Sequence, residues 1–271
     1  MNNNSAVGFT QRLISKAVVS HIRYAPVQRG KWRLLNAVSS LGLVCELERG
    51  VYVRIASPKD AMEKALVYGW KEKKEADRFL SFIRPGMTVF DVGSNLGTYS
   101  MLAARRVGPN GRVHAFEPTP RVAAKVERNA QLNGFDNIII NQVAVSSEPG
   151  MVTFYTHEED DRNSMGAASE TKISVPATTL DLYVQNAAVA KVDAMKIDAE
   201  GAEVLAFRGG ERLLAGEGAP DVILLEVSPE ALSLMGSTPA ELNAILRGHR
   251  YDLETLAEHE GYQNVLARKR P

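Results

Sequence analysis

The sequence predicts an α/β fold built around a mostly parallel β-sheet. From about residue 89 onward, short apolar runs alternate with stretches of helical spacing. The turns between them are short and contain Gly or Asn, a pattern typical of right-handed strand–helix–strand crossovers. One run, Val222–Leu225, is apolar throughout and indicates a strand buried on both faces. A chain of 271 residues has room for one such domain with an N-terminal extension.

The N-terminal extension, residues 1–60, is predicted to hold a helix and a β-hairpin. The helix covers Phe9–Ile22, with Leu13, Ala17 and Ile22 near one face. Strands Leu43–Leu47 and Val51–Ile55 flank a Glu-Arg-Gly turn, as in a hairpin.

The main domain, residues 61–271, is predicted to begin with a helix whose apolar residues lie within Ala76–Ile83 and which ends at Pro85-Gly86. The next elements are, in chain order, strand Val89–Val92, helix Thr98–Val107, strand Val113–Phe116, helix Pro120–Leu132 and strand Ile138–Val145. A β insertion at about 150–178 then interrupts the alternation, with strands Val152–Tyr155 and Ile173–Pro176 around the acidic loop His157–Glu170. The alternation resumes with strand Ala194–Ile197, helix Glu203–Leu214, strand Val222–Leu225, helix Pro239–Arg247 and strands Tyr251–Leu253 and Asn264–Ala267.

Composition and charge narrow the class of protein. The chain has no apolar stretch of the roughly 18–20 residues that a membrane span needs. Its single cysteine, Cys45, is compatible with a reducing compartment, so a cytoplasmic protein is expected. Residues 1–45 carry six Lys or Arg and no acid, whereas the remainder holds 26 basic and 32 acidic residues, a net of −6. The basic arm allows weak contact with anionic lipid, but the acidic body argues against a nucleic-acid groove.

The turn after strand Val89–Val92 indicates a nucleoside-bearing ligand. It runs from Asp91 through Gly93 and Asn95 to the start of the next helix, and Glu117 ends the next strand, where it can accept hydrogen bonds from ribose hydroxyls. A dinucleotide turn would have a glycine in place of Asn95, and Asp91 would repel a diphosphate but attract an ammonium group. A ligand with a ribose, an adenine and a cationic amino-acid tail therefore fits this turn better than NAD does. That ligand is S-adenosylmethionine. An NAD(P)-dependent reductase is the alternative for this segment, although the Tyr-x-x-x-Lys pair that many such reductases use is absent from the sequence.

Four motifs together resemble the FkbM family of methyltransferases. They are Val89-Phe90-Asp91-Val92-Gly93-Ser94-Asn95-Leu96-Gly97-Thr98-Tyr99-Ser100, Phe116-Glu117-Pro118, Thr178-Thr179-Leu180-Asp181 and Lys196-Ile197-Asp198-Ala199-Glu200-Gly201-Ala202-Glu203. The resemblance runs from about Gly69 to Val265. It implies a class I methyltransferase (Rossmann-like) fold: a seven-stranded, mostly parallel sheet with an antiparallel last strand and helices on both faces. It also implies S-adenosylmethionine-dependent methylation of a hydroxyl on a small molecule, a sugar or a lipid-linked glycan.

The resemblance also implies where S-adenosylmethionine binds. Its methionine end is expected at Asp91 and Gly93, its ribose at Glu117, and its purine against Pro118. Ala144 and Val145 would line the adenine, although plain core residues would give the same pattern. The complete expected set is Glu72, Asp91, Gly93, Ser94, Asn95, Gly97, Glu117, Pro118, Ala144, Val145 and Asp198. For Glu72, which falls where the family places an acid, a solvated carboxylate on a helix face is an equal alternative.

The acidic block after the fourth strand supplies the candidate catalytic groups. An aliphatic hydroxyl needs a base to take its proton. Glu200 is predicted to be this base or to bind the acceptor, with Asp198 beside the cofactor, because strand alternation would point both side chains the same way. Glu203 is assigned to the N-terminus of the next helix, which favours carboxylates. His157, in the insertion loop, is a further candidate proton acceptor.

Metal dependence and two other functions remain open. Asp198 and Glu226 follow the fourth and fifth strands, where oxygen ligands would suit magnesium or calcium. Glu226 has a second explanation, because it could instead bind the acceptor. The other functions are a catalytically silent binding protein and an RNA methyltransferase whose basic arm grips phosphates.

Overall fold

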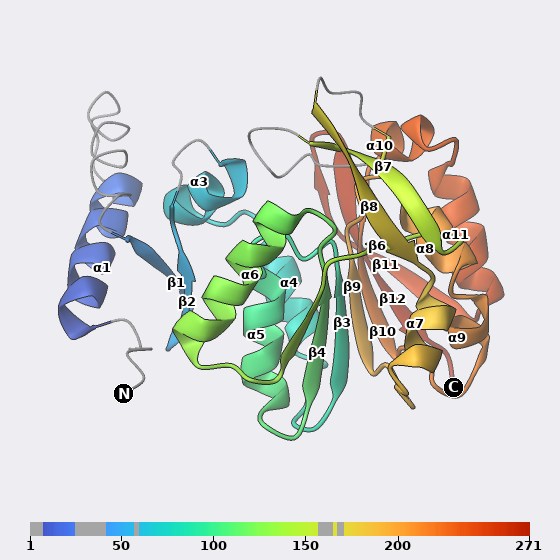
Figure 1. Ribbon diagram of the computed structural model, residues 1–271, viewed down its shortest axis with the longest axis horizontal. Helices are drawn as coiled ribbons and strands as arrows, with labels where there is room; N and C mark the ends of the chain where they lie inside the picture. The colour runs from blue at the N-terminus through green and yellow to red at the C-terminus, as the bar shows by residue number, and fades with distance from the viewer. Residues whose placement is uncertain (1–7, 25–41, 57–59, 157–164, 167–170) are drawn as a thin grey trace.

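A computed structural model describes residues 8–24, 42–56, 60–156, 165–166 and 171–271 (Figure 1). Its centre is a seven-stranded sheet with the order β11-β12-β10-β9-β3-β4-β5. Five of these strands run parallel to one another, and β12 runs antiparallel to both of its neighbours, which confirms the predicted sheet. The strands are β3 (Thr88–Val92), β4 (Arg112–Phe116), β5 (Ile138–Asn141), β9 (Ala194–Ile197), β10 (Val222–Val227), β11 (Tyr251–His259) and β12 (Tyr262–Lys269).

Helices cover both faces of this sheet (Figure 1). One face carries α4 (Lys73–Leu80), α5 (Thr98–Val107) and α6 (Pro120–Asn133). The other carries α7 (Leu180–Asn186), α8 (Glu203–Arg208), α9 (Glu211–Ala215), α10 (Pro229–Leu234) and α11 (Pro239–Gly248). Along β10, Val222 and Leu224 join the first core, while Ile223 and Leu225 join the second. The apolar run is therefore buried on both faces, as predicted.

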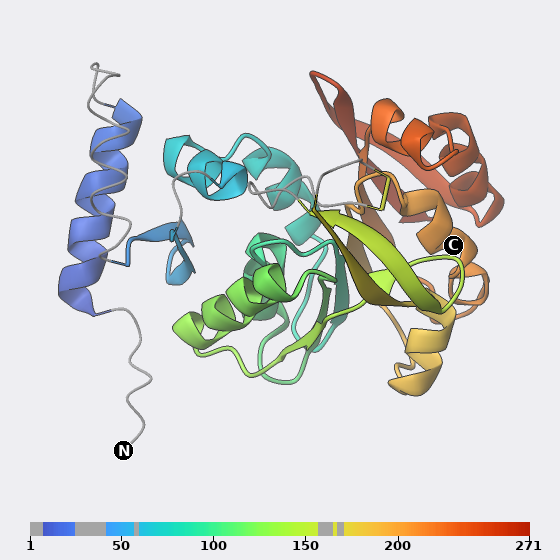
Figure 2. The same ribbon diagram turned by 45° about the horizontal axis from the view of Figure 1, so that its top comes forward.

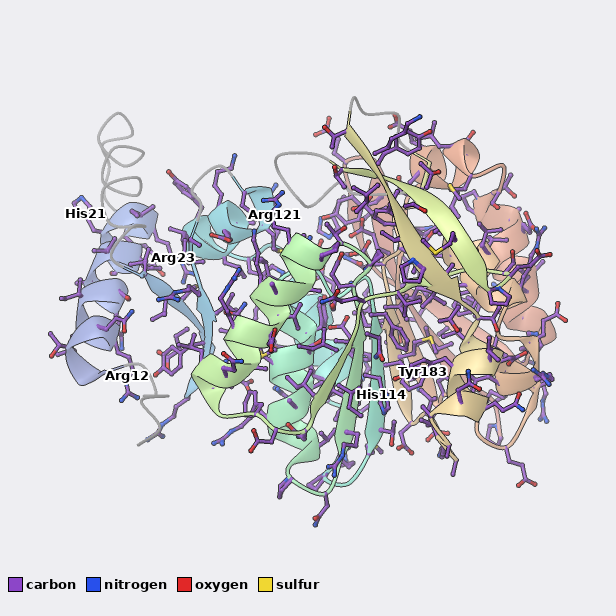
Figure 3. All side chains as sticks on the ribbon, viewed as in Figure 1. Arg12, His21, Arg23, His114, Arg121 and Tyr183 are labelled. Carbon is purple, nitrogen blue, oxygen red and sulfur yellow. The ribbon has the colours of Figure 1, made fainter. Side chains whose placement is uncertain are left out.

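The N-terminal elements lie at one side of the sheet (Figure 3). They are α1 (Phe9–Tyr24), the hairpin β1 (Val44–Glu48) and β2 (Val51–Arg54), and α3 (Ala61–Tyr68). Helix α1 stands outermost, with the hairpin on its inner side (Figure 2). Of the three residues on its predicted apolar face, Ile22 is buried, whereas Ala17 is exposed and Leu13 is 52% exposed, so the prediction was wrong for those two. Ser15 and Val19 are buried beside Ile22 instead. The helix has apolar residues on more than one side, and packing against the hairpin selects which of them are buried.

Side chains of α6 hold the hairpin against the main domain. Asn129 accepts a hydrogen bond from the backbone N–H of Arg54 at 2.9 Å, and Asn133 accepts one from Tyr52 at 2.8 Å. The amide of Asn133 also donates to the Tyr52 carbonyl at 2.7 Å. The two asparagines therefore satisfy backbone groups on the free edge of β2, much as another strand would.

A buried ion-pair cluster fixes α3 to the same helix. Lys125 of α6 lies 2.6 Å from Asp60 and 3.3 Å from Glu63, and both carboxylates are almost wholly buried. Asp60 also caps α3, because its side chain accepts a hydrogen bond from the Glu63 backbone N–H. This contact places α3 beside the cavity described below.

Two sequence predictions of single elements were wrong. The predicted strand Ile138–Val145 is split after Asn141: β5 belongs to the main sheet, whereas β6 (Ala144–Val145) pairs with β8 (Thr171–Thr178) in a separate sheet that also contains β7 (Gly150–Thr156). The backbone turns there, since Val143 N–H donates to the Asn141 carbonyl at 2.9 Å.

The predicted helix Glu203–Leu214 is two short helices, α8 and α9, that meet at Gly209 and Gly210. A Cβ atom on Gly209 would lie 2.2 Å from the Ser146 carbonyl oxygen, so the close approach of another segment needs glycine there. Helices α3, α7 and α10 had no counterpart in the sequence prediction. Among the residues that the structure describes, no helix is both long and apolar enough to cross a bilayer.

Candidate active site

The turn after β3 adopts a conformation that its sequence permits. Gly93, Asn95 and Gly97 have φ angles of 72°, 48° and 77°, in the region that favours glycine and tolerates asparagine. The N–H groups of Gly93 and Ser94 both donate to the Phe116 carbonyl at 3.0 Å, which ties the turn to the end of β4. A Cβ atom on Gly93 would lie only 1.8 Å from the backbone oxygen of Asp198. Glycine is therefore required where the turn touches the segment after β9.

Asp91 lies beneath this turn and does not line the cavity. It is 1% exposed, and its Oδ2 accepts a 2.5 Å hydrogen bond from Ser100. Burial raises the pKa of Asp91, although Lys196 and the Ser100 hydroxyl oppose the shift. Ser94 and Gly97 are likewise part of the turn and not of the cavity wall. The structure thus brings the predicted turn residues together but places three of them behind the surface that a ligand would meet.

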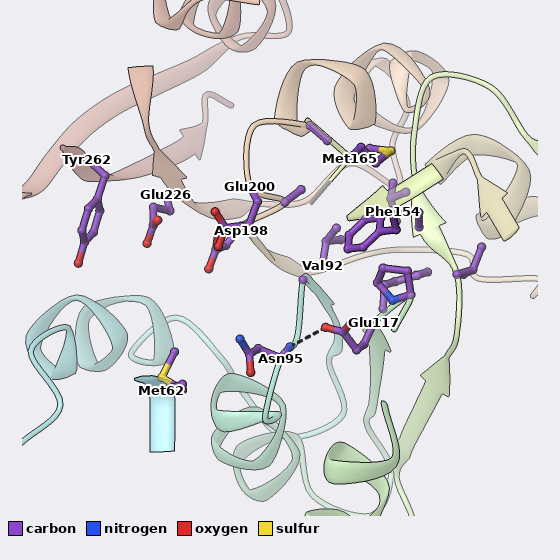
Figure 4. Close-up of a pocket in the computed structure, with 18 of the residues that line it drawn as sticks. Met62, Val92, Asn95, Glu117, Phe154, Met165, Asp198, Glu200, Glu226 and Tyr262 are labelled. Carbon is purple, nitrogen blue, oxygen red and sulfur yellow. Dashed lines mark hydrogen bonds between the residues drawn. The ribbon is translucent and has the colours of Figure 1, made fainter. Parts of the chain in front are cut away.

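The cavity above the turn has a volume of about 400 Å³, within the range of small-molecule sites (Figure 4). One end surrounds Glu117 and Pro118. It is otherwise apolar, with Val92, Phe116, Val143, Ala144, Val145, Phe154 and Met165. The other end is acidic and contains Glu72, Asp198, Glu200, Glu226 and Tyr262, with Met62 and Asn95 nearby. Eight of the eleven predicted cofactor residues, all except Asp91, Ser94 and Gly97, line this one cavity.

Glu117 is a buried carboxylate at the apolar end. It is 6% exposed, and its two oxygens accept hydrogen bonds from the backbone N–H groups of Thr119 at 2.9 Å and Asn95 at 3.2 Å (Figure 4). Burial raises the pKa of Glu117 from 4.5 to about 7, and these hydrogen bonds oppose the shift. A carboxylate held this way has oxygen lone pairs left to accept bonds from a ligand.

The acidic end joins segments that are distant in the chain. Tyr262, at the start of β12, donates a 2.8 Å hydrogen bond from its hydroxyl to Glu72, which precedes α4. Burial raises the pKa of Glu226, and the nearby carboxylates of Asp198, Glu72 and Glu200 raise it further. This concentration of negative charge suits a ligand that carries positive charge.

The block after β9 adopts a turn and not a continued strand. Strand β9 ends at Ile197, and Glu200 has a φ of 51°. Strand alternation therefore does not extend to Glu200, yet both Asp198 and Glu200 line the cavity. Glu203 is 2% exposed and accepts hydrogen bonds from the backbone N–H groups of Ala199 at 2.8 Å and Gly201 at 3.3 Å. It holds the turn that presents the other two acids.

The remaining predicted residues give a mixed result. His157 lies outside the described residues. Asp198 and Glu226 both line the cavity, but among the described residues no group of three or more His, Cys, Asp or Glu side chains could hold a metal ion. Tyr262, Met62 and Phe154 were missed, because each comes from an element with no motif of its own. Met165 is part of the insertion loop, which the break in strand–helix alternation had already marked.

One polar atom on the cavity wall is consistent with a ligand that supplies a hydrogen bond. Asn95 lines the cavity, and its Oδ1 is buried without a hydrogen-bond partner among the described residues. Buried polar atoms normally have one. Together with the apolar end around Glu117 and the acidic end opposite, this atom fits a nucleoside that bears a cationic tail, which is the chemistry of S-adenosylmethionine.

Comparisons with known proteins agree with this geometry. The chain is 44% identical over 75 residues to 31-O-demethyl-FK506 methyltransferase FkbM of Streptomyces tacrolimicus, covering 27% of this chain and 28% of that protein. It is 29% identical over 118 residues to ribosomal RNA large subunit methyltransferase E of Sorangium cellulosum, covering 44% and 52%. It is 26% identical over 152 residues to 2-O-methyltransferase NoeI of Sinorhizobium fredii, covering 48% and 60%. Each match spans less than two thirds of the relative's length.

Residues 91–253 match the family described as the methyltransferase FkbM domain. The match includes the turn, Glu117 and the acidic block, and it covers more than half of the chain. At the level of the family it confirms the predicted class, S-adenosylmethionine-dependent methyltransferases. The chain therefore belongs to the FkbM methyltransferase family.

Proposed function

We propose that this protein is an O-methyltransferase that transfers the methyl group of S-adenosylmethionine to a hydroxyl of a small molecule, a sugar or a lipid-linked glycan. The observation that carries the proposal is that one cavity has an apolar end and an acidic end. Its apolar end holds a buried carboxylate, and its acidic end holds four carboxylates at the ends of β9 and β10 and before α4.

Each end of the cavity has a role in binding the donor. Glu117 accepts hydrogen bonds from the ribose hydroxyls, while apolar side chains such as Phe154 and Val145 pack against the adenine. The acidic end attracts the ammonium and sulfonium groups, because no Lys, Arg or His is among the described residues that line the cavity. Asn95 lies between the two ends and shapes the surface beneath the donor.

The protein's own residues then prepare the acceptor. When bound, S-adenosylmethionine supplies a methyl group on a positively charged sulfur, which becomes a neutral thioether as the acceptor oxygen takes the methyl. Glu200 receives the proton of the acceptor hydroxyl as the new carbon–oxygen bond forms. Asp198 lies in the same cavity beside the donor, and Glu226 orients the acceptor by accepting a hydrogen bond from it. Holding both reactants in one cavity supplies much of the acceleration.

The names of two relatives support oxygen as the accepting atom, since one is a 31-O-demethyl-FK506 methyltransferase and the other a 2-O-methyltransferase. A third relative is named for ribosomal RNA, which favours RNA as a second candidate acceptor. The acidic end of the cavity and the net charge of −6 outside residues 1–45 oppose a phosphate backbone there. RNA binding that weakens steeply with salt and disappears on deletion of residues 1–40 would favour RNA instead.

Calorimetry with S-adenosylhomocysteine tests the donor site. The wild type should bind, and Glu117→Ala should bind at least 100-fold more weakly. Asp91→Ala should also weaken binding, through loss of the support beneath the turn. Absence of binding to the wild type would contradict the proposal.

Turnover tests the base. Glu200→Gln should keep its affinity for S-adenosylhomocysteine and lose methyl transfer across a panel of hydroxylated acceptors, whereas the exposed Glu230→Gln should retain both. Unchanged transfer by Glu200→Gln would exclude Glu200 as the base. A wild type that binds the donor but releases no S-adenosylhomocysteine with any acceptor would favour the catalytically silent binding protein.

A further inference from the structure

Lys196 is a buried cation directly beneath the acidic end of the cavity. It belongs to β9 and is 7% exposed. Its Nζ donates hydrogen bonds to the Gly93 carbonyl at 2.9 Å and to Asp198 Oδ2 at 3.2 Å. The same nitrogen lies 4.0 Å from Asp91 Oδ1 and 5.4 Å from the centre of the Tyr99 ring. One ammonium group thus joins two of the four sequence motifs, the turn after β3 and the acidic block to which Lys196 itself belongs.

These contacts join segments that are more than 100 residues apart. Gly93 is in the turn after β3, and Asp198 is the first residue after β9. The two also touch directly, since a Cβ atom on Gly93 would meet the Asp198 backbone oxygen at 1.8 Å. The backbone contact sets how closely the segments approach. The Lys196 hydrogen bonds set where the Asp198 carboxylate points relative to the turn.

The surroundings of Lys196 keep it charged. Burial lowers the pKa of Lys196, but the carboxylates of Asp198 and Asp91 outweigh burial, and the net change is upward. A charged donor makes stronger hydrogen bonds than a neutral one. The Asp198 carboxylate is therefore held by a charge-assisted bond and does not turn freely in the cavity.

We propose that Lys196 is a positioning residue for the methyl donor, acting through Asp198: by binding the Gly93 carbonyl and the Asp198 carboxylate together, it holds the two donor-binding segments in one arrangement. This inference rests on the proposed binding of S-adenosylmethionine in the cavity. Lys196 is not among the residues that line the cavity, so its effect on the donor passes through Asp198 and the turn.

The test is a double-mutant cycle in which calorimetry measures the affinity for S-adenosylhomocysteine. Lys196→Met and Asp198→Asn should each weaken binding at least tenfold. The double variant should be no more than about threefold weaker than the poorer single variant, because a residue that acts through its neighbour has nothing left to position. Losses that multiply would overturn the proposal, as would an unchanged affinity of Lys196→Met.

Controls separate positioning from unfolding. Lys191→Met removes an exposed lysine near the start of the same strand and should leave the affinity unchanged. Lys196→Arg keeps the charge but places a larger, planar guanidinium in a buried site, which moves its donors away from the position of Lys196 Nζ. This variant should bind S-adenosylhomocysteine about threefold to tenfold more weakly, with a Tm within 3 °C of the wild type. It therefore tests the positioning role of Lys196 even if Lys196→Met does not fold. Affinity equal to the wild type in Lys196→Arg would then overturn the proposal. A wild type that binds no S-adenosylhomocysteine would instead refute the proposed function.

Discussion

Substituting Glu117 by glutamine should stabilise the free protein at alkaline pH while removing donor binding. Glu117 is almost wholly buried at the apolar end of the cavity, and burial raises its pKa from 4.5 to about 7. Between these two values the folded protein binds more protons than the unfolded chain, so stability falls as pH rises through this window. The cost of burying the charge is absent below about pH 4.5 and complete above about pH 7.

The size of the effect follows from the pKa. At 1.36 kcal/mol per pH unit, the change from 4.5 to about 7 corresponds to roughly 3 kcal/mol at pH 8. Glutamine carries no charge but keeps one acceptor oxygen, so it loses one of the two backbone hydrogen bonds, about 1 kcal/mol. The net gain is about 2 kcal/mol at pH 8 and about zero at pH 5. For a domain of this size it raises Tm by roughly 4–8 °C at pH 8.

Thermal unfolding at pH 5 and pH 8, with calorimetry of S-adenosylhomocysteine, checks both halves of this reasoning. Glu117→Gln should gain Tm over the wild type only at pH 8 and bind at least 100-fold more weakly, because two hydrogen bonds to a charged group contribute about 1.5–3 kcal/mol each. Glu127→Gln, an exposed carboxylate on α6, is the control. The same Tm difference at both pH values would refute the burial argument. Retained affinity would refute the assignment of Glu117 to the ribose.

Three further substitutions test how the site is held. Gly93→Ala should lower the free energy of unfolding, measured in urea, by roughly 3 kcal/mol or more and abolish S-adenosylhomocysteine binding, because its Cβ would meet a backbone oxygen at 1.8 Å. The control Gly86→Ala, also at positive φ but in open space, should cost only about 1–2 kcal/mol. Lys125→Met removes the cation that lies 2.6 Å from Asp60 and 3.3 Å from Glu63 and should cost about 3–5 kcal/mol by the same measurement. A loss below about 1 kcal/mol would show that this pairing is dispensable. Asn133→Ala removes two hydrogen bonds from the edge of β2 and should cost about 1–2 kcal/mol, while the exposed Gln131→Ala on the same helix should cost almost nothing.

The parallel strands, the turn at Gly93 and the acidic block could be predicted from the sequence because each is a local pattern. An apolar run of four residues followed by a glycine turn is typical of a buried strand wherever it lies in the chain. Breaks within an element were harder to predict. The division after Asn141 and the end of α8 at Gly209 depend on other segments that pair with or touch the chain there.

The class of fold, the family and ten of the residues that line the cavity could be predicted from the sequence alone: eight expected cofactor residues, Glu200 and Glu226. Three further facts came from the folded structure: Asp91 lies beneath the cavity, Tyr262 and Met62 reach into it from opposite ends of the chain, and Lys196 joins the turn to Asp198. The difference arises because the interactions that decide local structure and those that form the cavity act over different ranges along the chain. Periodicity and turn chemistry act over a few neighbouring residues, whereas the cavity is formed by contacts between segments that meet only when the sheet is complete.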